Sequence, residues 1–240
     1  MKREILDNYE QVSARAAEIV ANAVRRKPDI TLGLPTGETP IGLYKRLSDE
    51  SKAGNLDFSG VTTFNLDEYY PISPNDPESY RYFMNKHLFS GINIPIEMTH
   101  VPPGDAPDPI QAAAEYEDLI RVHGGIDLQV LGIGRNGHIG FNEPGDSFDS
   151  LTHMVTLTQS TIEANARLFS SADEVPRHAL TMGIGTILRA REILILITGE
   201  EKQEALQTLL KGEERQDCPA TALLRHPNVT LLCDRAAYGK

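Results

Sequence analysis

A glycine-rich run carries the residue types best suited to acid–base chemistry in this chain. Residues 131–144 read Leu-Gly-Ile-Gly-Arg-Asn-Gly-His-Ile-Gly-Phe-Asn-Glu-Pro and continue the apolar stretch 126–131. We expect that stretch to be a buried strand, and the glycines after it let the backbone turn sharply beside a ligand. His138 titrates near neutral pH, and Glu143 can fix its tautomer and raise its basicity. The run, which also holds Asn136 and Asn142, therefore predicts proton transfer at the end of a strand.

Three other interpretations of this run are weaker. The spacing Gly-x-Gly-x-x-Gly over 132–137 is typical of dinucleotide-binding proteins, but that motif must open a long helix. Glycines and a proline at 140–145 would soon interrupt such a helix. We expect no metal, because His138 and Glu143 lack the spacing of a helical ligand pair and no third ligand is near in the sequence. A structural histidine in a glycine turn remains an alternative.

A pair of acidic residues, Asp67 and Glu68, follows the apolar stretch 61–66. Such a pair could simply be a solvated turn. If 61–66 and 126–131 are parallel strands of one sheet, however, their carboxyl ends meet at one edge, and Asp67 shares that edge with His138. A carboxylate base beside a histidine–carboxylate pair can carry out proton transfers on a small substrate.

Two strand–glycine–helix junctions could bind an anion. Residues 36–39, Thr-Gly-Glu-Thr, separate a short strand from a helix, where backbone N–H groups and hydroxyls favour a phosphate. This is not a Walker loop, because no Gly-Lys-Ser/Thr follows. Lys202 follows Gly199 in the expected first turn of another helix, where a cation opposes the helix dipole unless an anion is bound. An exposed, solubilising lysine is the alternative.

Apolar runs that alternate with helical patterns indicate a parallel sheet covered on both faces. We expect strands at 30–34, 61–66, 126–131, 192–198 and 229–233. We expect helices at 12–24, 41–47, 78–89, 112–122 and 200–210. The prediction is one α/β domain over residues 1–240, with an open, mostly parallel, Rossmann-like sheet covered by helices on both faces. A small mobile lid is expected around 145–175, because it begins with a stretch rich in Gly, Asp and Ser.

Composition limits the partners of the protein. The chain has 240 residues and a formal net charge of −11, which argues against nucleic acid or an anionic membrane as its main partner. Its two cysteines lack zinc-site spacing and are expected to be idle thiols in a reducing compartment. No signal sequence and no apolar run of membrane-spanning length is apparent, so we expect a cytoplasmic location.

Five segments of the chain closely resemble the glucosamine-6-phosphate deaminase family, which is related to the 6-phosphogluconolactonases. They are residues 32–40, 64–69, 77–80, 131–144 and 178–185, in order across nearly the whole chain. The segments Asn-Leu-Asp-Glu-Tyr at 65–69 and Gly-His-Ile-Gly-Phe-Asn-Glu-Pro at 137–144 are highly specific to that family. The resemblance implies conversion of glucosamine 6-phosphate and water to fructose 6-phosphate and ammonia, with neither a metal nor another cofactor.

The resemblance also implies roles for individual residues. Asp67 corresponds to the base that moves a proton between C2 and C1, and His138 to the group that opens the sugar ring. Glu143 and Asn136 correspond to partners of His138, although many relatives have aspartate at position 136.

The phosphate site is implied in the same way. Arg167 and Lys202 correspond to the family's phosphate-binding cations. Thr36, Gly37 and Thr39 correspond to its phosphate loop.

Two departures from the family pattern carry expectations of their own. Glu38 stands where relatives usually have a small residue, and we expect its side chain to point outward. The hexameric, allosterically activated relatives have basic residues where this chain has His153 and Val155, and they have a longer C-terminus. We therefore expect a monomer or small homo-oligomer that N-acetylglucosamine 6-phosphate does not activate.

Two alternative functions remain open. A 6-phosphogluconolactonase shares the fold and the phosphate loop, but ester hydrolysis needs no proton shuttle such as Asp67. A non-catalytic sugar-phosphate sensor is disfavoured, because we see no helix-turn-helix and no basic extension in the sequence.

Overall fold

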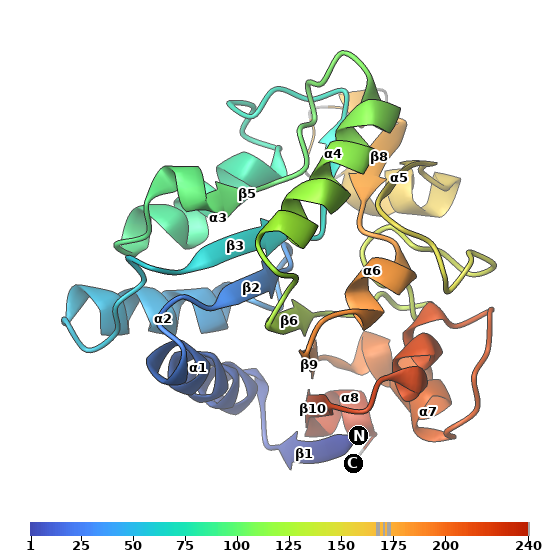
Figure 1. Ribbon diagram of the computed structural model, residues 1–240. Coiled ribbons are helices and arrows are strands. Elements are labelled where there is room, and N and C mark those ends of the chain that lie inside the picture. The colour runs from blue at the N-terminus through green and yellow to red at the C-terminus, as the bar shows by residue number, and fades with distance from the viewer. Residues whose placement is uncertain (167–168, 170, 172–173, 240) are drawn as a thin grey trace.

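A seven-stranded, wholly parallel sheet forms the centre of the protein in the computed structural model, which describes residues 1–166, 169, 171 and 174–239 (Figure 1). In spatial order its strands are β1 (Lys2–Leu6), β10 (Val229–Asp234), β9 (Glu192–Ile197), β6 (Leu128–Leu131), β2 (Thr31–Leu34), β3 (Thr62–Asn65) and β5 (Thr99–His100). The five strands predicted from apolar runs are the five inner strands of this sheet. The two that were missed, β1 and β5, are its edges.

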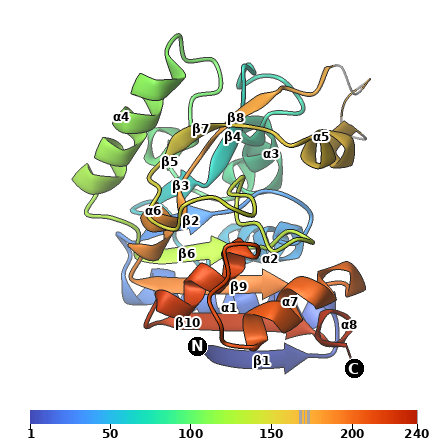
Figure 2. The same cartoon turned by 90° about the vertical axis from the view of Figure 1, so that its right-hand side faces the viewer.

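Helices cover both faces of the sheet (Figure 2). One face packs against α1 (Tyr9–Arg26), α2 (Ile41–Lys52) and α3 (Tyr80–His87) with η1 (Phe89–Gly91). The other packs against α4 (Pro109–Val122), α6 (Ile184–Leu188), α7 (Gln203–Leu210), η6 (Pro219–Arg225) and α8 (Arg235–Tyr238). A short 3-10 turn, η2 (Ile96–Met98), precedes β5. The predicted layering, an open parallel sheet between two helical layers, is confirmed.

Strand β9 shows why the predicted strands are apolar at successive positions and do not alternate between apolar and polar residues. Leu194 and Leu196 belong to the core cluster beneath α1 and α2, whereas Ile193, Ile195 and Ile197 belong to the cluster beneath α7 and η6. Successive side chains of a strand point to opposite faces, so a strand covered on both faces must be apolar at every position.

A second sheet of three antiparallel strands was not predicted. It contains β4 (Asp67–Tyr70), β8 (His178–Thr181) and β7 (His153–Thr156) in that order, with α5 (Gln159–Asn165) beside it (Figure 2). Asp67 was expected just past the end of a strand, with a solvated turn as the alternative; it opens a further strand, β4, where it pairs with Thr181. The first three residues of β4 are buried, but its sequence, Asp-Glu-Tyr-Tyr, lacks the apolar run by which the other buried strands were predicted.

The main sheet has a topological switch point between β2 and β6. The strands that follow β2 in the chain, β3 and β5, lie on one side of this point, and those that follow β6, β9 and β10, lie on the other side, with β1 at the edge beyond them. In open α/β sheets, ligands bind beyond the carboxyl ends of the strands at such a switch point. The loops after β2 and β6 carry Thr36 and His138 respectively, so the fold places two of the predicted site segments there.

The predicted lid around 145–175 is only partly described. Its first residues are tethered, because Phe148 is buried and the backbone N–H of Gly145 donates to the Gln216 carbonyl at 2.8 Å. The backbone carbonyl of Ser150 also accepts from the N–H of Gly185 at 2.9 Å. Movement of the remainder, which includes α5, stays a prediction.

Candidate active site

Four chain segments leave the carboxyl edge of the main sheet. They follow β9, β6, β2 and β3, which are neighbours in that order, and all four strands are parallel (Figure 1). These segments carry Lys202, His138, Thr36–Thr39 and Asp67 respectively, and Asp67 is the first residue of β4. The sheet therefore gathers all the predicted site segments that the structure describes.

Glycines shape the turn that presents His138. Gly137 has φ of +81°, a conformation that side chains rarely adopt. A Cβ atom at Gly134 would overlap the His138 imidazole, and one at Gly137 would overlap the Cys218 thiol. The sequence predicted that these glycines make room for a ligand. Gly134 instead makes room for the histidine ring itself, and Gly137 for a buried cysteine.

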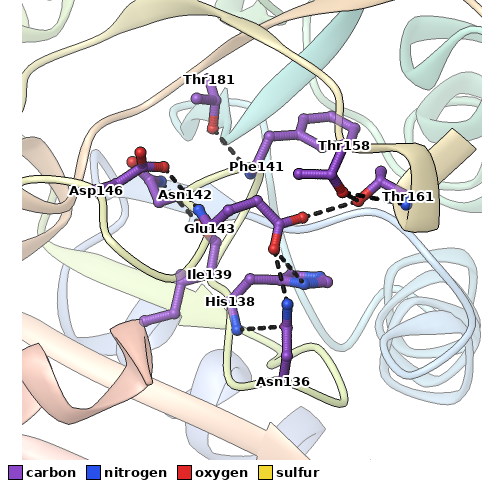
Figure 3. Close-up of polar contacts among 10 residues, drawn as sticks. All are labelled: Asn136, His138, Ile139, Phe141, Asn142, Glu143, Asp146, Thr158, Thr161 and Thr181. Atoms are coloured by element: carbon purple, nitrogen blue, oxygen red, sulfur yellow. Dashed lines mark hydrogen bonds and ion pairs between the residues drawn. The ribbon is translucent and has the colours of Figure 1, made fainter. Parts of the chain in front are cut away.

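Asn142 holds the far side of the same turn. Its amide donates to the carbonyls of Ile139 and Met182, at 2.8 Å each, and its side chain is fully buried. The N–H of Phe141 donates to the Thr181 hydroxyl at 3.2 Å. The turn is thus fastened to the end of β8 (Figure 3).

Asn136, His138 and Glu143 come together as predicted (Figure 3). Asn136 accepts from the backbone N–H of His138 at 3.1 Å and donates its side-chain amide to Glu143 Oε2 at 2.8 Å. That same oxygen lies 3.8 Å from His138 Nδ1, which is too long for a hydrogen bond. Nδ1 is buried and has no hydrogen-bond partner among the described residues. The histidine and the carboxylate are therefore adjacent but not joined in this state.

The surroundings of His138 keep its imidazole neutral near pH 7. Burial lowers its pKa and the Lys202 cation lowers it further, whereas Glu143 acts in the opposite direction. The net result is a pKa below the ordinary value of 6.5. A neutral imidazole can accept a proton from a hydroxyl group, which a protonated one cannot.

Asp67 lies against the His138 turn with its side chain almost fully buried. A Cβ atom at Gly140 would lie 3.1 Å from Asp67 Oδ2 and 2.9 Å from Thr181 Oγ1. Burial, together with the neighbouring Glu68 charge, raises the pKa of Asp67 to about 8. No hydrogen bond to its carboxyl group is recorded from the described part of the chain. A carboxyl group with a pKa near neutrality is suited to take up and return a proton.

Glu68 has a different position from Asp67, although the two are consecutive. Its carboxylate accepts backbone N–H groups from Tyr69 at 2.9 Å, Tyr80 at 2.8 Å and Arg81 at 2.9 Å. Burial raises its pKa to about 7 in spite of those three bonds. Glu68 thus anchors the first turn of α3, and Asp67 alone of the pair lies against the His138 turn.

The loop after β2 has the features of an anion cradle. Gly37 has φ of +96°, and no hydrogen bond is described from the backbone N–H or the side chain of Thr36, Gly37 or Thr39 within the residues the structure covers. Helix α2 follows with Pro40 at its N-cap and no side-chain cap. Free N–H groups and hydroxyls at the start of a helix favour a phosphate.

Lys202 faces this site from the loop after β9. The sequence predicted it in the first turn of a helix over 200–210, whereas it closes the 3-10 turn η5 (Glu200–Lys202) and caps α7. The pKa of Lys202 is below its ordinary value, mainly because the side chain is partly buried. The charge of Arg135 lowers this pKa as well, whereas the charges of Glu201 and Glu38 act in the opposite direction. Glu38 is exposed, in line with its expected outward position, yet its charge reaches Lys202.

The predicted second cation, Arg167, lies outside the described residues. Sequence reasoning in turn overlooked two nearby residues. Arg135 lies within the glycine-rich run, and its charge acts on Lys202. Its place beside Asn136 and His138 in the sequence could have indicated that it lies near the site. Thr161 donates its hydroxyl to Glu143 Oε1 at 2.8 Å from α5, and no sequence pattern indicated that contact.

The described residues offer no cluster of three or more His, Cys, Asp or Glu side chains that could hold a metal ion. The expectation of metal-free chemistry stays a prediction. In the same part of the chain, every helix is too short or too polar to cross a membrane.

Comparison with known proteins gives consistent matches. Residues 7–232 match the family model described as glucosamine-6-phosphate isomerases/6-phosphogluconolactonase. A glucosamine-6-phosphate deaminase of Thermoanaerobacter pseudethanolicus is 52% identical over 237 residues, which cover 99% of this chain and 94% of that protein. Glucosamine-6-phosphate deaminase 2 of Bacillus subtilis is 49% identical over 242 residues, covering 100% of this chain and 97% of the relative.

Solved structures agree with this pattern. A structure described as a monomeric glucosamine-6-phosphate deaminase has a TM-score of 0.97 at 48% identity, over 100% of this chain and 99% of that one. The 6-phosphogluconolactonase of Trypanosoma cruzi has a TM-score of 0.81 at 19% identity, over 100% of this chain and 96% of that one. The second similarity is one of fold alone.

Proposed function

The chain belongs to the glucosamine-6-phosphate isomerase and 6-phosphogluconolactonase family, and we infer that within it the chain is a glucosamine-6-phosphate deaminase. It converts glucosamine 6-phosphate and water to fructose 6-phosphate and ammonia. The observation that carries this conclusion is the sequence identity to proteins named as deaminases, which is 52% and 49% over 99% and 100% of this chain. A lactonase is not favoured, because the 6-phosphogluconolactonases of Trypanosoma cruzi and Trypanosoma brucei with solved structures are only 19% and 17% identical to this chain.

The phosphate group of the substrate binds at the loop of Thr36, Gly37 and Thr39, with Lys202 and Arg167 as the cations. The free N–H groups of this loop and the half-buried ammonium of Lys202 support that assignment. Fixing the phosphate places the sugar ring over the His138 turn, and such positioning is itself a large part of catalysis.

Ring opening is assigned to His138. Its neutral imidazole accepts the proton of the O1 hydroxyl and delivers it to the ring oxygen as the C1–O5 bond breaks, which yields an aldehyde at C1. Glu143, oriented by Asn136, stabilises the imidazolium that forms in between. The separation of 3.8 Å between Nδ1 and Glu143 Oε2 must shorten for that contact.

Proton transfer between carbons is assigned to Asp67. Once the aldehyde has formed, the C2 proton lies α to a carbonyl, and Asp67 removes it in its ionised form, which a pKa of about 8 makes the minor form at neutral pH. Returning that proton to C1 produces an imine at C2. Water then adds to C2 and ammonia leaves, so that the ketone of fructose 6-phosphate forms. Each acid–base group of this kind contributes about 10²–10⁴-fold to the rate.

The biological setting follows from the reaction. We place the enzyme in the catabolism of amino sugars such as N-acetylglucosamine, as a hydrolase of the cytoplasm. The solved relative described as monomeric supports a monomer, and we expect no activation by N-acetylglucosamine 6-phosphate.

The decisive assay incubates the protein with glucosamine 6-phosphate and measures ammonia and fructose 6-phosphate together. Equal amounts of both products are expected. Hydrolysis of 6-phosphogluconolactone without release of ammonia from the amino sugar would instead identify a lactonase, and binding without any turnover would identify a sensor.

The role of His138 has its own test. His138→Gln should slow turnover of the closed-ring substrate much more than that of an open-chain analogue, since only the former needs ring opening. Equal losses on both would assign His138 to another step.

A further inference from the structure

The two oxygens of the Glu143 carboxylate have separate partners. Oε2 accepts the Asn136 amide at 2.8 Å and faces His138 Nδ1 at 3.8 Å. Oε1 accepts the Thr161 hydroxyl, also at 2.8 Å (Figure 3). The carboxylate therefore bridges two segments, the glycine-rich turn after β6 and the helix α5.

The Thr161 hydroxyl is fixed in direction as well as in position. A threonine hydroxyl has one proton, and Thr161 donates it to the carboxylate, which accepts only. The Thr158 hydroxyl, 2.9 Å from that of Thr161, must then be the donor in their mutual contact. Thr158 is also the N-cap of α5 and accepts the backbone N–H of Thr161 at 3.3 Å. A directed chain of hydroxyls thus runs from the start of α5 to Glu143.

A second contact joins the same elements through apolar side chains. Ile162, the residue after Thr161, is buried in a cluster with Phe141 of the glycine-rich run and Tyr69 of β4. Any shift of α5 relative to that run therefore acts on both the apolar cluster and the Glu143 carboxylate. Oε1 is bonded to α5 while Oε2 faces the histidine, so a shift of α5 would be transmitted through the carboxylate to the distance between Oε2 and Nδ1.

We propose that Thr161 is a positioning residue for ring opening, which couples the seating of α5 to the contact between Glu143 and His138. This inference rests on the proposed deaminase function and goes beyond it, since no step of the reaction requires a hydroxyl at position 161. It makes proton transfer at His138 efficient only when α5 is packed against the site.

The test compares Thr161→Val, which keeps the branched shape but removes the hydroxyl, with Thr161→Ser, which keeps the hydroxyl. Loss of a hydrogen bond to a carboxylate should lower kcat for glucosamine 6-phosphate about tenfold in Thr161→Val, whereas Thr161→Ser should stay within about threefold of the original enzyme. Affinity for the open-chain amino alditol 6-phosphate, measured as an inhibitor, should be unchanged in both variants.

Glu163→Gln is the matched control. Glu163 is exposed on the same helix and contacts Gln159 rather than the site, so kcat and KM should not change. Thr161→Ala provides a second hydroxyl-free variant should the valine disturb folding, and circular dichroism checks that each variant is folded.

Two results would overturn the proposal. One is a kcat for folded Thr161→Val or Thr161→Ala within twofold of the original enzyme. The other is a loss of inhibitor affinity that accompanies the loss of kcat in Thr161→Val and Thr161→Ala and that is equally large in Thr161→Ser. If instead the unmodified protein releases no ammonia from glucosamine 6-phosphate, the proposed function itself fails, and the two failures are thereby distinguished.

Discussion

Replacement of Asp67 by asparagine should slow turnover by about 10²–10⁴-fold, and it should stabilise the protein relative to the original by an amount that grows as the pH rises. The pKa of the Asp67 carboxyl is about 8 in the folded chain, against 3.8 for an unperturbed aspartate, because burial and the Glu68 charge disfavour its ionised form. Stability from this group is complete below pH 3.8 and is lost as the pH rises towards 8. Asparagine cannot ionise and removes that loss.

The magnitude follows from the two pKa values. Between pH 5 and pH 7 the unfolded chain has Asp67 ionised while the folded chain keeps it protonated, and each pH unit is then worth about 1.4 kcal/mol. The free energy of unfolding of Asp67→Asn relative to the original protein should therefore rise by about 3 kcal/mol over that interval. The buried amide of the variant does not titrate, so any cost of burying it changes the difference equally at both pH values and leaves its slope intact.

Urea unfolding at pH 5, 6 and 7 measures this difference. Asp127→Asn is the control with the opposite sign. Burial raises the pKa of Asp127, but Lys27 at 2.5 Å, the backbone N–H of Thr31 at 2.9 Å and Arg191 outweigh burial and lower it. Its removal should destabilise the protein by the same amount at pH 5 and pH 7, because stability from a lowered pKa is lost only at more acidic pH.

Activity measurements complete the test of Asp67. The asparagine variant should still bind glucosamine 6-phosphate but should no longer exchange the C2 proton with solvent. A stability difference that is flat between pH 5 and pH 7 would show that Asp67 is already ionised in the fold. Undiminished exchange of the C2 proton would remove Asp67 from its proposed role.

Three further substitutions test the glycines and the phosphate site. Gly134→Ala should displace the His138 ring by roughly 1 Å and lower kcat about a hundredfold, with little change in melting temperature. A kcat within about threefold of that of the original enzyme would show that the position of the ring is not critical. Gly137→Ala combines a strained φ with overlap on the Cys218 thiol and should cost about 2 kcal/mol or more in urea unfolding, so an unchanged midpoint would contradict the described backbone. Lys202→Gln should raise KM for glucosamine 6-phosphate at least about tenfold with kcat largely kept, and an unchanged KM would exclude Lys202 as a phosphate ligand.

The inner part of the main sheet could be predicted because its strands are buried on both faces. Five runs of apolar residues, among them 192–198, gave five strands, and their alternation with helices required a parallel arrangement. Parallel strands in turn bring their carboxyl ends to one edge, so the sequence determined that Asp67, His138 and Lys202 would share that edge.

The edges and the second sheet could not be read in the same way. Strand β5 has two residues, β1 is mostly exposed, and β4 reads Asp-Glu-Tyr-Tyr. Their hydrogen-bond partners, such as Thr181 opposite Asp67, are distant in sequence, and no local pattern identifies them.

The sequence by itself therefore determined which residues carry the chemistry and which edge of the sheet they occupy, because residue type and the direction of parallel strands are local properties. Only the tertiary structure decided their electrostatic states and their exact partners. The raised pKa of Asp67 comes from burial beneath segments far along the chain, and the contact of Thr161 with Glu143 spans two elements. Both depend on how separate elements pack, which no spacing within the sequence encodes.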